Sequence, residues 1–125
     1  MPSPMPWTSY PTYVNAMLQR SRTAVRRVGD AVEERWQQTN AGEIPLGHDV
    51  AELAATAGLP NFTVKHISLL IDLHKKTLAM VNESIVRGPW SAWDLWFFRR
   101  EVRKAVKIVE RNASAILKSL GEPTR

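Results

Sequence analysis

The sequence contains no cysteine and no long apolar stretch. The lack of cysteine excludes disulfide bonds, thiolate metal sites and a thiol nucleophile. The lack of any run of about 18 apolar residues excludes an ordinary membrane-spanning helix. Residues 1–6 carry neither a basic segment nor an apolar one, so we expect no signal peptide at this end of the chain.

Patterns typical of enzymes and metal centres are also missing. The three histidines, His48, His66 and His74, do not have metal-ligand spacing. No pair of carboxylates and no combination of Ser, His and Asp stands out as a catalytic set. We therefore predict no enzymatic activity, no metal site and no cofactor.

Charge is plentiful and is sorted by position along the chain. Residues 1–27 hold four bases and no acid (+4), residues 28–86 hold four bases and eight acids (−4), and residues 87–125 hold nine bases and four acids (+5). Together these give the net charge of +5. A length of 125 residues and a hydrophobic content of 44% are typical of one globular domain. Clustered bases indicate a polyanionic partner such as nucleic acid.

Apolar positions recur at helical spacing, as in the stripe predicted for the first helix (Val14, Leu18, Ser21, Val25, Val28, Val32 and Trp36), and helix-terminus signals divide the chain into four helices. Asn61 can cap the start of the third helix, Ser91 with Asp94 can cap the start of the fourth, and Gly121 can end it. No segment alternates between apolar and polar residues for long enough to indicate a strand. Four prolines predict an extended arm over residues 1–11, and a short tail over residues 122–125 follows the last helix. We predict a single all-α domain over residues 12–121, with long helices from Thr12 to about Gln38, from Asn61 to about Val86 and from Ser91 to Leu120, and a short helix from Asp49 to about Ala57.

Basic residues form rows on the first and fourth predicted helices. Spacings of three, four and seven residues place several of them on one side of each helix. Like charges so placed repel one another, and bound phosphates, which arginine can grip in two places, would compensate. A solvated polar face is the alternative interpretation. The predicted nucleic-acid-binding residues are Arg20, Arg22, Arg26 and Arg27 on the first helix and Arg99, Arg100, Arg103, Lys104, Lys107 and Arg111 on the fourth.

Aromatic residues gather at the start of the fourth predicted helix. Our leading interpretation is that they anchor the core; a subunit interface comes second, a contact with membrane headgroups third, and stacking on single-stranded bases last. Two more aromatic residues, in the proline-rich arm, would contact a neighbouring subunit or ligand. The candidate interface residues are Trp7, Tyr10, Trp90, Trp93, Trp96 and Phe97.

A short segment, residues 53–67, resembles the helix-turn-helix of lactose-repressor-type regulators. Ala54 lies on its first helix, Gly58 permits a tight left-handed turn, and Val64 and Ile67 would pack the second helix at an angle to the first. A purely structural bend between two helices is the alternative. If the resemblance holds, the base-reading positions would be occupied by Asn61, Lys65 and His66.

The chain as a whole resembles the major coat proteins of filamentous and rod-shaped archaeal DNA viruses. The likeness lies in a short, cysteine-free, all-α chain with a proline-rich arm, two long helices bearing arginine rows, and aromatic patches. It implies a nucleocapsid protein of the virion, whose subunits wrap double-stranded DNA in the A form inside a helical filament. It also implies that the subunit pairs with a second copy of itself or with a paralogous coat subunit. Residues 1–11 would then lie on a neighbouring subunit, and the tryptophan cluster would be available to contact a lipid envelope.

Two other functions remain open on the sequence. The first is a helix-turn-helix transcriptional regulator, which would act in the cytoplasm. The second is a helical module that binds another protein or a membrane surface. Binding that ignores base sequence and depends steeply on salt favours the coat protein, whereas a strongly preferred palindromic site favours the regulator.

Overall fold

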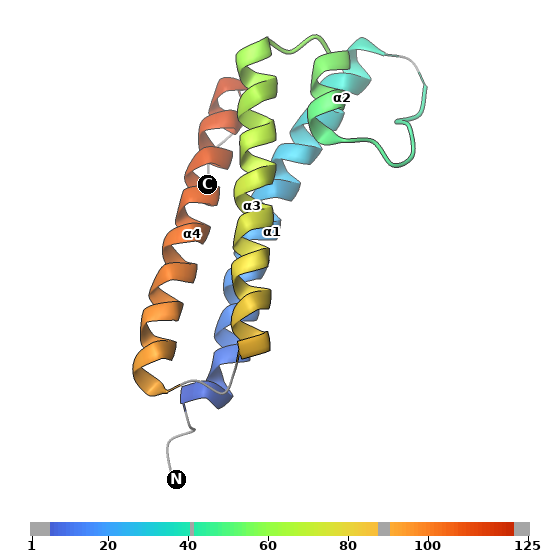
Figure 1. The fold of residues 1–125 in the computed structure, drawn as a ribbon. Coiled ribbons are helices and arrows are strands. Elements are labelled where there is room, and N and C mark those ends of the chain that lie inside the picture. The colour runs from blue at the N-terminus through green and yellow to red at the C-terminus, as the bar shows by residue number, and fades with distance from the viewer. Residues whose placement is uncertain (1–5, 41, 88–90, 122–125) are drawn as a thin grey trace.

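The computed structural model describes residues 6–40, 42–87 and 91–121. These contain helices α1 (Pro6–Thr39), α2 (Val50–Thr56), α3 (Asn61–Arg87) and α4 (Ala92–Ser119), and no strand occurs among them. Figure 1 shows α1, α3 and α4 running side by side as a long bundle, with the short α2 and the loop before it at one end. The start of α4 lies at the opposite end of the bundle (Figure 1). The predicted all-α fold, with three long helices and one short, is confirmed.

Helix α1 begins at Pro6, earlier than the predicted start at Thr12. Residues 6–11 are therefore helical, and the prediction that they form part of an extended arm is wrong. A proline at the first helical position is tolerated because its missing N–H has no intrahelical partner there. Pro11 removes one hydrogen bond close to the helix start, and the helix continues through it. The rest of the predicted arm, residues 1–5, and the predicted tail, residues 122–125, lie outside the described residues.

The core is built from the apolar stripes of the three long helices. One cluster joins α2 and the start of α3 to the second halves of α1 and α4, and it includes Val32, Leu70 and Ile116. A second cluster joins the first halves of α1 and α4 to the end of α3. The stripe predicted for α1 is largely confirmed, since all of its members are buried except Val25, which is partly buried. Helix α1 packs most extensively against α4, and this pairing forms the site described below.

Both ends of α4 have the predicted capping residues. The Ser91 hydroxyl oxygen accepts a hydrogen bond from the Asp94 N–H (3.2 Å) and donates one to the Asp94 carboxylate (2.8 Å). At the other end Gly121 has a φ of +78°, a left-handed conformation that favours glycine. These caps set the two ends of α4, the helix that carries the predicted basic row and the aromatic cluster.

Replacing the capping serine is expected to destabilise the fold. Ser91→Ala leaves the N–H groups at the start of α4 without a side-chain acceptor, so the free energy of unfolding should fall by about 0.5–2 kcal/mol. Urea denaturation followed by circular dichroism measures this change. Ser114→Ala, at an exposed position within the same helix, is the matched control and should change stability by less than about 0.5 kcal/mol. Equal effects of the two substitutions would contradict a capping role.

The segment that resembles a helix-turn-helix does contain the predicted left-handed turn. Gly58 has a φ of +84°, the Gly58 N–H donates to the Ala55 carbonyl (3.0 Å), and the Leu59 N–H donates to the Ala54 carbonyl (3.1 Å). Asn61, predicted to cap α3, is its first residue instead, because the Pro60 carbonyl already accepts the first helical N–H groups. Helix α3 then runs the length of the bundle and packs on α1 and α4.

A polar contact joins α1 to α3 inside the bundle. The hydroxyl of Ser21, which is fully buried, lies 2.6 Å from Nδ1 of His74. Burial disfavours the charged imidazolium, and Arg22 adds electrostatic repulsion, so the pKa of His74 lies below its usual value of 6.5.

This lowered pKa predicts a pH-dependent stability. The unfolded chain takes up a proton on His74 near pH 6.5, whereas the folded chain does so only at lower pH. The free energy of unfolding should therefore fall as the pH drops below about 6.5, until the folded-state pKa is passed. Urea midpoints measured from about pH 7.5 to about pH 5.5 should show this loss, and His74→Gln should reduce it. An identical pH dependence in the variant would contradict the assignment to His74.

Candidate nucleic-acid interface

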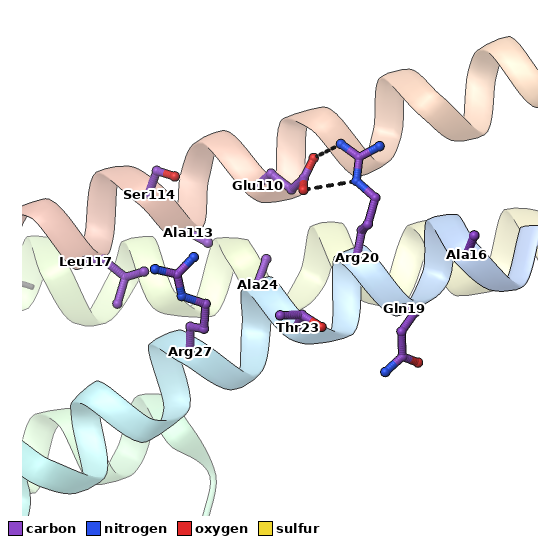
Figure 2. Close-up of a pocket in the computed structure, with 10 residues that line it drawn as sticks. All are labelled: Ala16, Gln19, Arg20, Thr23, Ala24, Arg27, Glu110, Ala113, Ser114 and Leu117. Atoms are coloured by element: carbon purple, nitrogen blue, oxygen red, sulfur yellow. Dashed lines mark hydrogen bonds and ion pairs between the residues drawn. The ribbon is translucent and has the colours of Figure 1, made fainter. Parts of the chain in front are cut away.

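A groove runs along the line where α1 and α4 meet. Its main hollow, of about 460 Å³, lies between the two helices, and an adjoining hollow of about 360 Å³ is lined by α4 alone; the two share Glu110 and Ser114. Figure 2 shows the larger hollow, with Arg20 and Arg27 both projecting from α1 toward α4. We call this the basic groove; its lining residues are Ala16, Gln19, Arg20, Thr23, Ala24 and Arg27 from α1 and Lys107, Glu110, Arg111, Ala113, Ser114 and Leu117 from α4.

The spacing of these residues along each helix explains why they meet. Arg20 and Arg27 are seven residues apart, which returns a helix to the same face after two turns. Lys107 and Arg111 are four apart and lie on one face of α4. Short alanine side chains from both helices line the groove between the charged residues, so the surface is hollowed there.

Positive charge dominates the basic groove. Its lining contains four cations (Arg20, Arg27, Lys107 and Arg111) and one carboxylate, which gives a net charge of +3. Lys107 and Arg111 are exposed, and neither forms an ion pair with any residue that the structure describes. Cations without internal partners are available to an external anion.

The single carboxylate of the groove belongs to Glu110, which is paired with Arg20. Arg20 donates two parallel hydrogen bonds, from Nη2 to Oε1 (2.5 Å) and from Nε to Oε2 (3.2 Å) (Figure 2). The hydrogen bond to Glu110 raises the pKa of Arg20 above its usual value, against the opposing effect of burial. Both side chains remain partly exposed, at 44% and 34%, and such pairs contribute only about 0–1 kcal/mol to stability. A phosphate with the same two-oxygen geometry can therefore replace the carboxylate on Arg20.

Removing the charge of Glu110 is expected to strengthen polyanion binding. Glu110→Gln raises the groove charge from +3 to +4 and leaves Arg20 without a competing carboxylate, so affinity for duplex DNA should rise by about threefold to tenfold at moderate salt. Fluorescence anisotropy with a labelled duplex measures this change. Glu34→Gln, an exposed position on α1 outside the groove, alters the net charge equally and should have little effect. An equal rise in DNA affinity in both variants would show that affinity depends only on the net charge of the protein and not on the groove.

Tyr13 of α1 organises the arginines that precede the groove on α4. The guanidinium of Arg99 lies over the Tyr13 ring, 4.4 Å from its centroid, and Nε of Arg103 donates to the Tyr13 hydroxyl (3.1 Å). This tyrosine was not predicted as a site residue. The sequence did contain a signal for it: Tyr13 precedes Arg20 by seven residues, the same spacing that separates Arg20 from Arg27 and places residues on one face of a helix. Glu110 offered no comparable signal, since its partner is 90 residues away.

Two other predicted cations of α4 have partners on the same helix. The Arg100 guanidinium lies 5.8 Å from the ring centroid of Trp96, and Nζ of Lys104 lies 3.8 Å from the Glu101 carboxylate. Both pairs are exposed and weak, so these cations remain accessible.

The arginines of α1 do not all lie in the groove. Arg22 and Arg26 follow Arg20 by two and six residues, which turns them by about 200° and 240° around the helix axis. Arg22 is close enough to His74 of α3 to lower the pKa of that histidine. The row predicted for α1 is therefore divided, with Arg20 and Arg27 on the α4 side and the other two elsewhere.

The leading interpretation of the aromatic cluster is wrong for three of its members. Trp93, Trp96 and Phe97 are 67%, 52% and 43% exposed, so they do not anchor the core. They pack on one another instead, with ring centroids 5.0–5.7 Å apart. Positions 93, 96 and 97 lie on the side of α4 that carries Arg100, away from the buried stripe that starts at Leu95. Of the other candidate interface residues, Trp90 and the side chains of Trp7 and Tyr10 lie outside the described part of the structure.

The residues proposed to read bases are not equally accessible. Asn61 and Lys65 are exposed at the start of α3. His66, however, is partly buried, and its Nε2 lies 2.8 Å from the Asn112 Oδ1 on α4. This hydrogen bond joins α3 to α4, so His66 holds the bundle together rather than projecting into solvent.

No protein-family model, curated protein or solved structure matches this chain. None of the helices in residues 6–40, 42–87 and 91–121 is long and apolar enough to cross a membrane. Within the same residues, no three His, Asp or Glu side chains are grouped so that they could hold a metal ion. Functional inference therefore depends on the groove and the surfaces around it.

Proposed function

We propose that this protein binds double-stranded DNA through its phosphates, without reading base sequence, as a structural coat-type protein that assembles along the duplex. The observation that carries this proposal is the composition of the basic groove, four cations from two helices around one carboxylate. The coat-type role, with self-assembly into a filament in the virion, comes from the resemblance of the whole chain described above.

Arginine and lysine side chains on both sides of the groove suit the phosphate backbone. Guanidinium groups can bind phosphate oxygens in pairs, as Arg20 binds Glu110, and each contact releases condensed counterions from the DNA. The basic residues from Arg99 to Arg111 extend over about 18 Å of α4, a length that spans several base pairs of duplex. The groove residues of α1 provide a second row of cations beside them.

The helix-turn-helix alternative is less well supported by the geometry. Its candidate base-reading histidine is bonded to α4, and the helix that would enter a DNA groove packs on two other helices along its length. Residues 49–76 carry three bases and three acids, so they offer no net attraction for DNA. Phosphate binding by α1 and α4 requires neither an accessible His66 nor an α3 that is free to enter a DNA groove.

Electron microscopy of the purified protein with a long linear duplex tests this proposal. We expect continuous coating of the DNA into filaments, equally on duplexes of unrelated sequence. Asn61→Ala combined with Lys65→Ala, both at exposed positions of the candidate base-reading surface, should leave this coating unchanged. Discrete particles at one palindromic site, bound about a thousandfold more tightly than random DNA, would establish the regulator instead and overturn the proposal.

A further inference from the structure

The two ends of the bundle differ in charge, and each exposes apolar side chains. One end is the start of α4, where exposed Trp93, Trp96 and Phe97 adjoin Arg100 and Lys104; we call it the aromatic end. The other is the part of the chain around α2, residues 42–64, which we call the acidic lobe. Figure 1 places the two at opposite ends of the long axis.

The aromatic end combines a large apolar surface with a net positive charge, since residues 92–104 contain four cations and two carboxylates, Asp94 and Glu101. Its three rings remain 43–67% exposed even though they pack on one another. The Arg100 guanidinium lies 5.8 Å from the ring centroid of Trp96, so apolar and cationic groups are in direct contact. Exposed aromatic rings beside arginine are the residue types enriched at the centres of protein interfaces.

The acidic lobe has the complementary properties. No lysine or arginine occurs between Arg35 and Lys65, whereas Glu43, Asp49 and Glu52 are all exposed. Two large apolar side chains project from the same region, because Leu46 is fully exposed and Phe62 is 71% exposed. The lobe thus carries both exposed apolar side chains and exposed carboxylates.

We infer that the aromatic end of one copy binds the acidic lobe of a second copy. Charge decides between this contact and a symmetric one, because pairing two aromatic ends would place Arg100 and Lys104 against each other, and pairing two lobes would bring their carboxylates together. Since the two surfaces differ and lie at opposite ends, the contact is heterologous and repeats into an open chain of subunits. The inference rests on the assembly part of the proposed function and leaves Arg20, Arg27 and Arg111 in the groove for DNA.

Two variants and their mixture test this contact without DNA. Trp96→Ala with Arg100→Glu disables the aromatic end, and Leu46→Ala with Glu52→Lys disables the lobe. All four substitutions are at exposed positions, and circular dichroism checks that both variants fold. Analytical ultracentrifugation should show wild-type mass growing with concentration and each variant associating about a hundredfold more weakly. Mixing the two variants should restore one intact contact, giving dimers that grow no further.

The controls separate this inference from its alternatives. Asp72→Lys, on the exposed surface of α3, changes the charge as Glu52→Lys does and should leave association intact. Association of the lobe variant at the wild-type level would overturn the contact, because it is the result expected if two aromatic ends pair with each other. A wild type that stays monomeric would also overturn it. If that monomer bound anionic lipid vesicles through its aromatic end, the partner of this end would be a membrane surface instead. DNA binding by the wild type is measured in parallel. Self-association without DNA binding would contradict the proposed function alone, whereas DNA binding by a wild type that stays monomeric would contradict the contact alone.

Discussion

Lys107→Glu combined with Arg111→Glu is expected to weaken binding to duplex DNA by at least about a hundredfold. The wild-type groove has four cations and one carboxylate, a charge of +3. The double variant would have two cations and three carboxylates, a charge of −1. Phosphates would then be repelled from the groove, and Arg20 would have additional carboxylates nearby. Anisotropy titrations with a labelled duplex at moderate salt measure the loss.

A matched double reversal elsewhere on the surface separates the groove from overall charge. Lys75→Glu with Lys76→Glu changes the net charge by the same amount at exposed positions of α3. We expect this control to weaken binding by less than about tenfold, because it acts only through the long-range field. Equal losses in the two double variants would mean that DNA does not bind in the basic groove.

Ile67→Ala is expected to lower the free energy of unfolding by about 2–5 kcal/mol. Ile67 lies in the segment that resembles a helix-turn-helix, but its side chain is completely buried in the cluster that joins α2 and α3 to α1 and α4. Truncation would leave a cavity where four elements meet, and the surrounding helices cannot close it without losing other contacts.

Chemical denaturation measures this loss, and a neighbouring leucine provides the control. Leu69 lies two residues further along α3 and is 49% exposed, so Leu69→Ala should lower stability by less than about 1 kcal/mol. If Ile67→Ala left stability unchanged but reduced DNA binding, the segment would be acting in recognition, and its assignment to the core would be wrong.

Local sequence signals were sufficient for most of the fold. Ser91 and Gly121 mark the ends of α4 because capping depends on residues within one turn of the chain. Gly58 marks the turn before α3 for the same reason. The start of α1 was missed because proline density argues against a helix, whereas prolines near a helix start remove few hydrogen bonds.

The site could be predicted only in part, because it depends on how the helices are rotated against one another. Helix α4 is apolar on two sides near its start, and the sequence does not say which side faces α1 and α3. Leu95 proved to be buried, whereas Trp93 and Trp96 are exposed. The pairing of Arg20 with Glu110 joins residues 90 positions apart, which no local pattern indicates.

The most direct test of phosphate binding by the basic groove is the salt dependence of the DNA-binding constant. For the wild type, the logarithm of this constant should fall steeply with the logarithm of salt concentration, with the same slope on two duplexes of unrelated sequence. Replacing Lys107 and Arg111 by glutamine should reduce that slope by about two, since each lost phosphate contact removes about 0.9. An unchanged slope in this double variant would contradict phosphate binding by the basic groove. So would a wild-type affinity that differs about a thousandfold between the two duplexes.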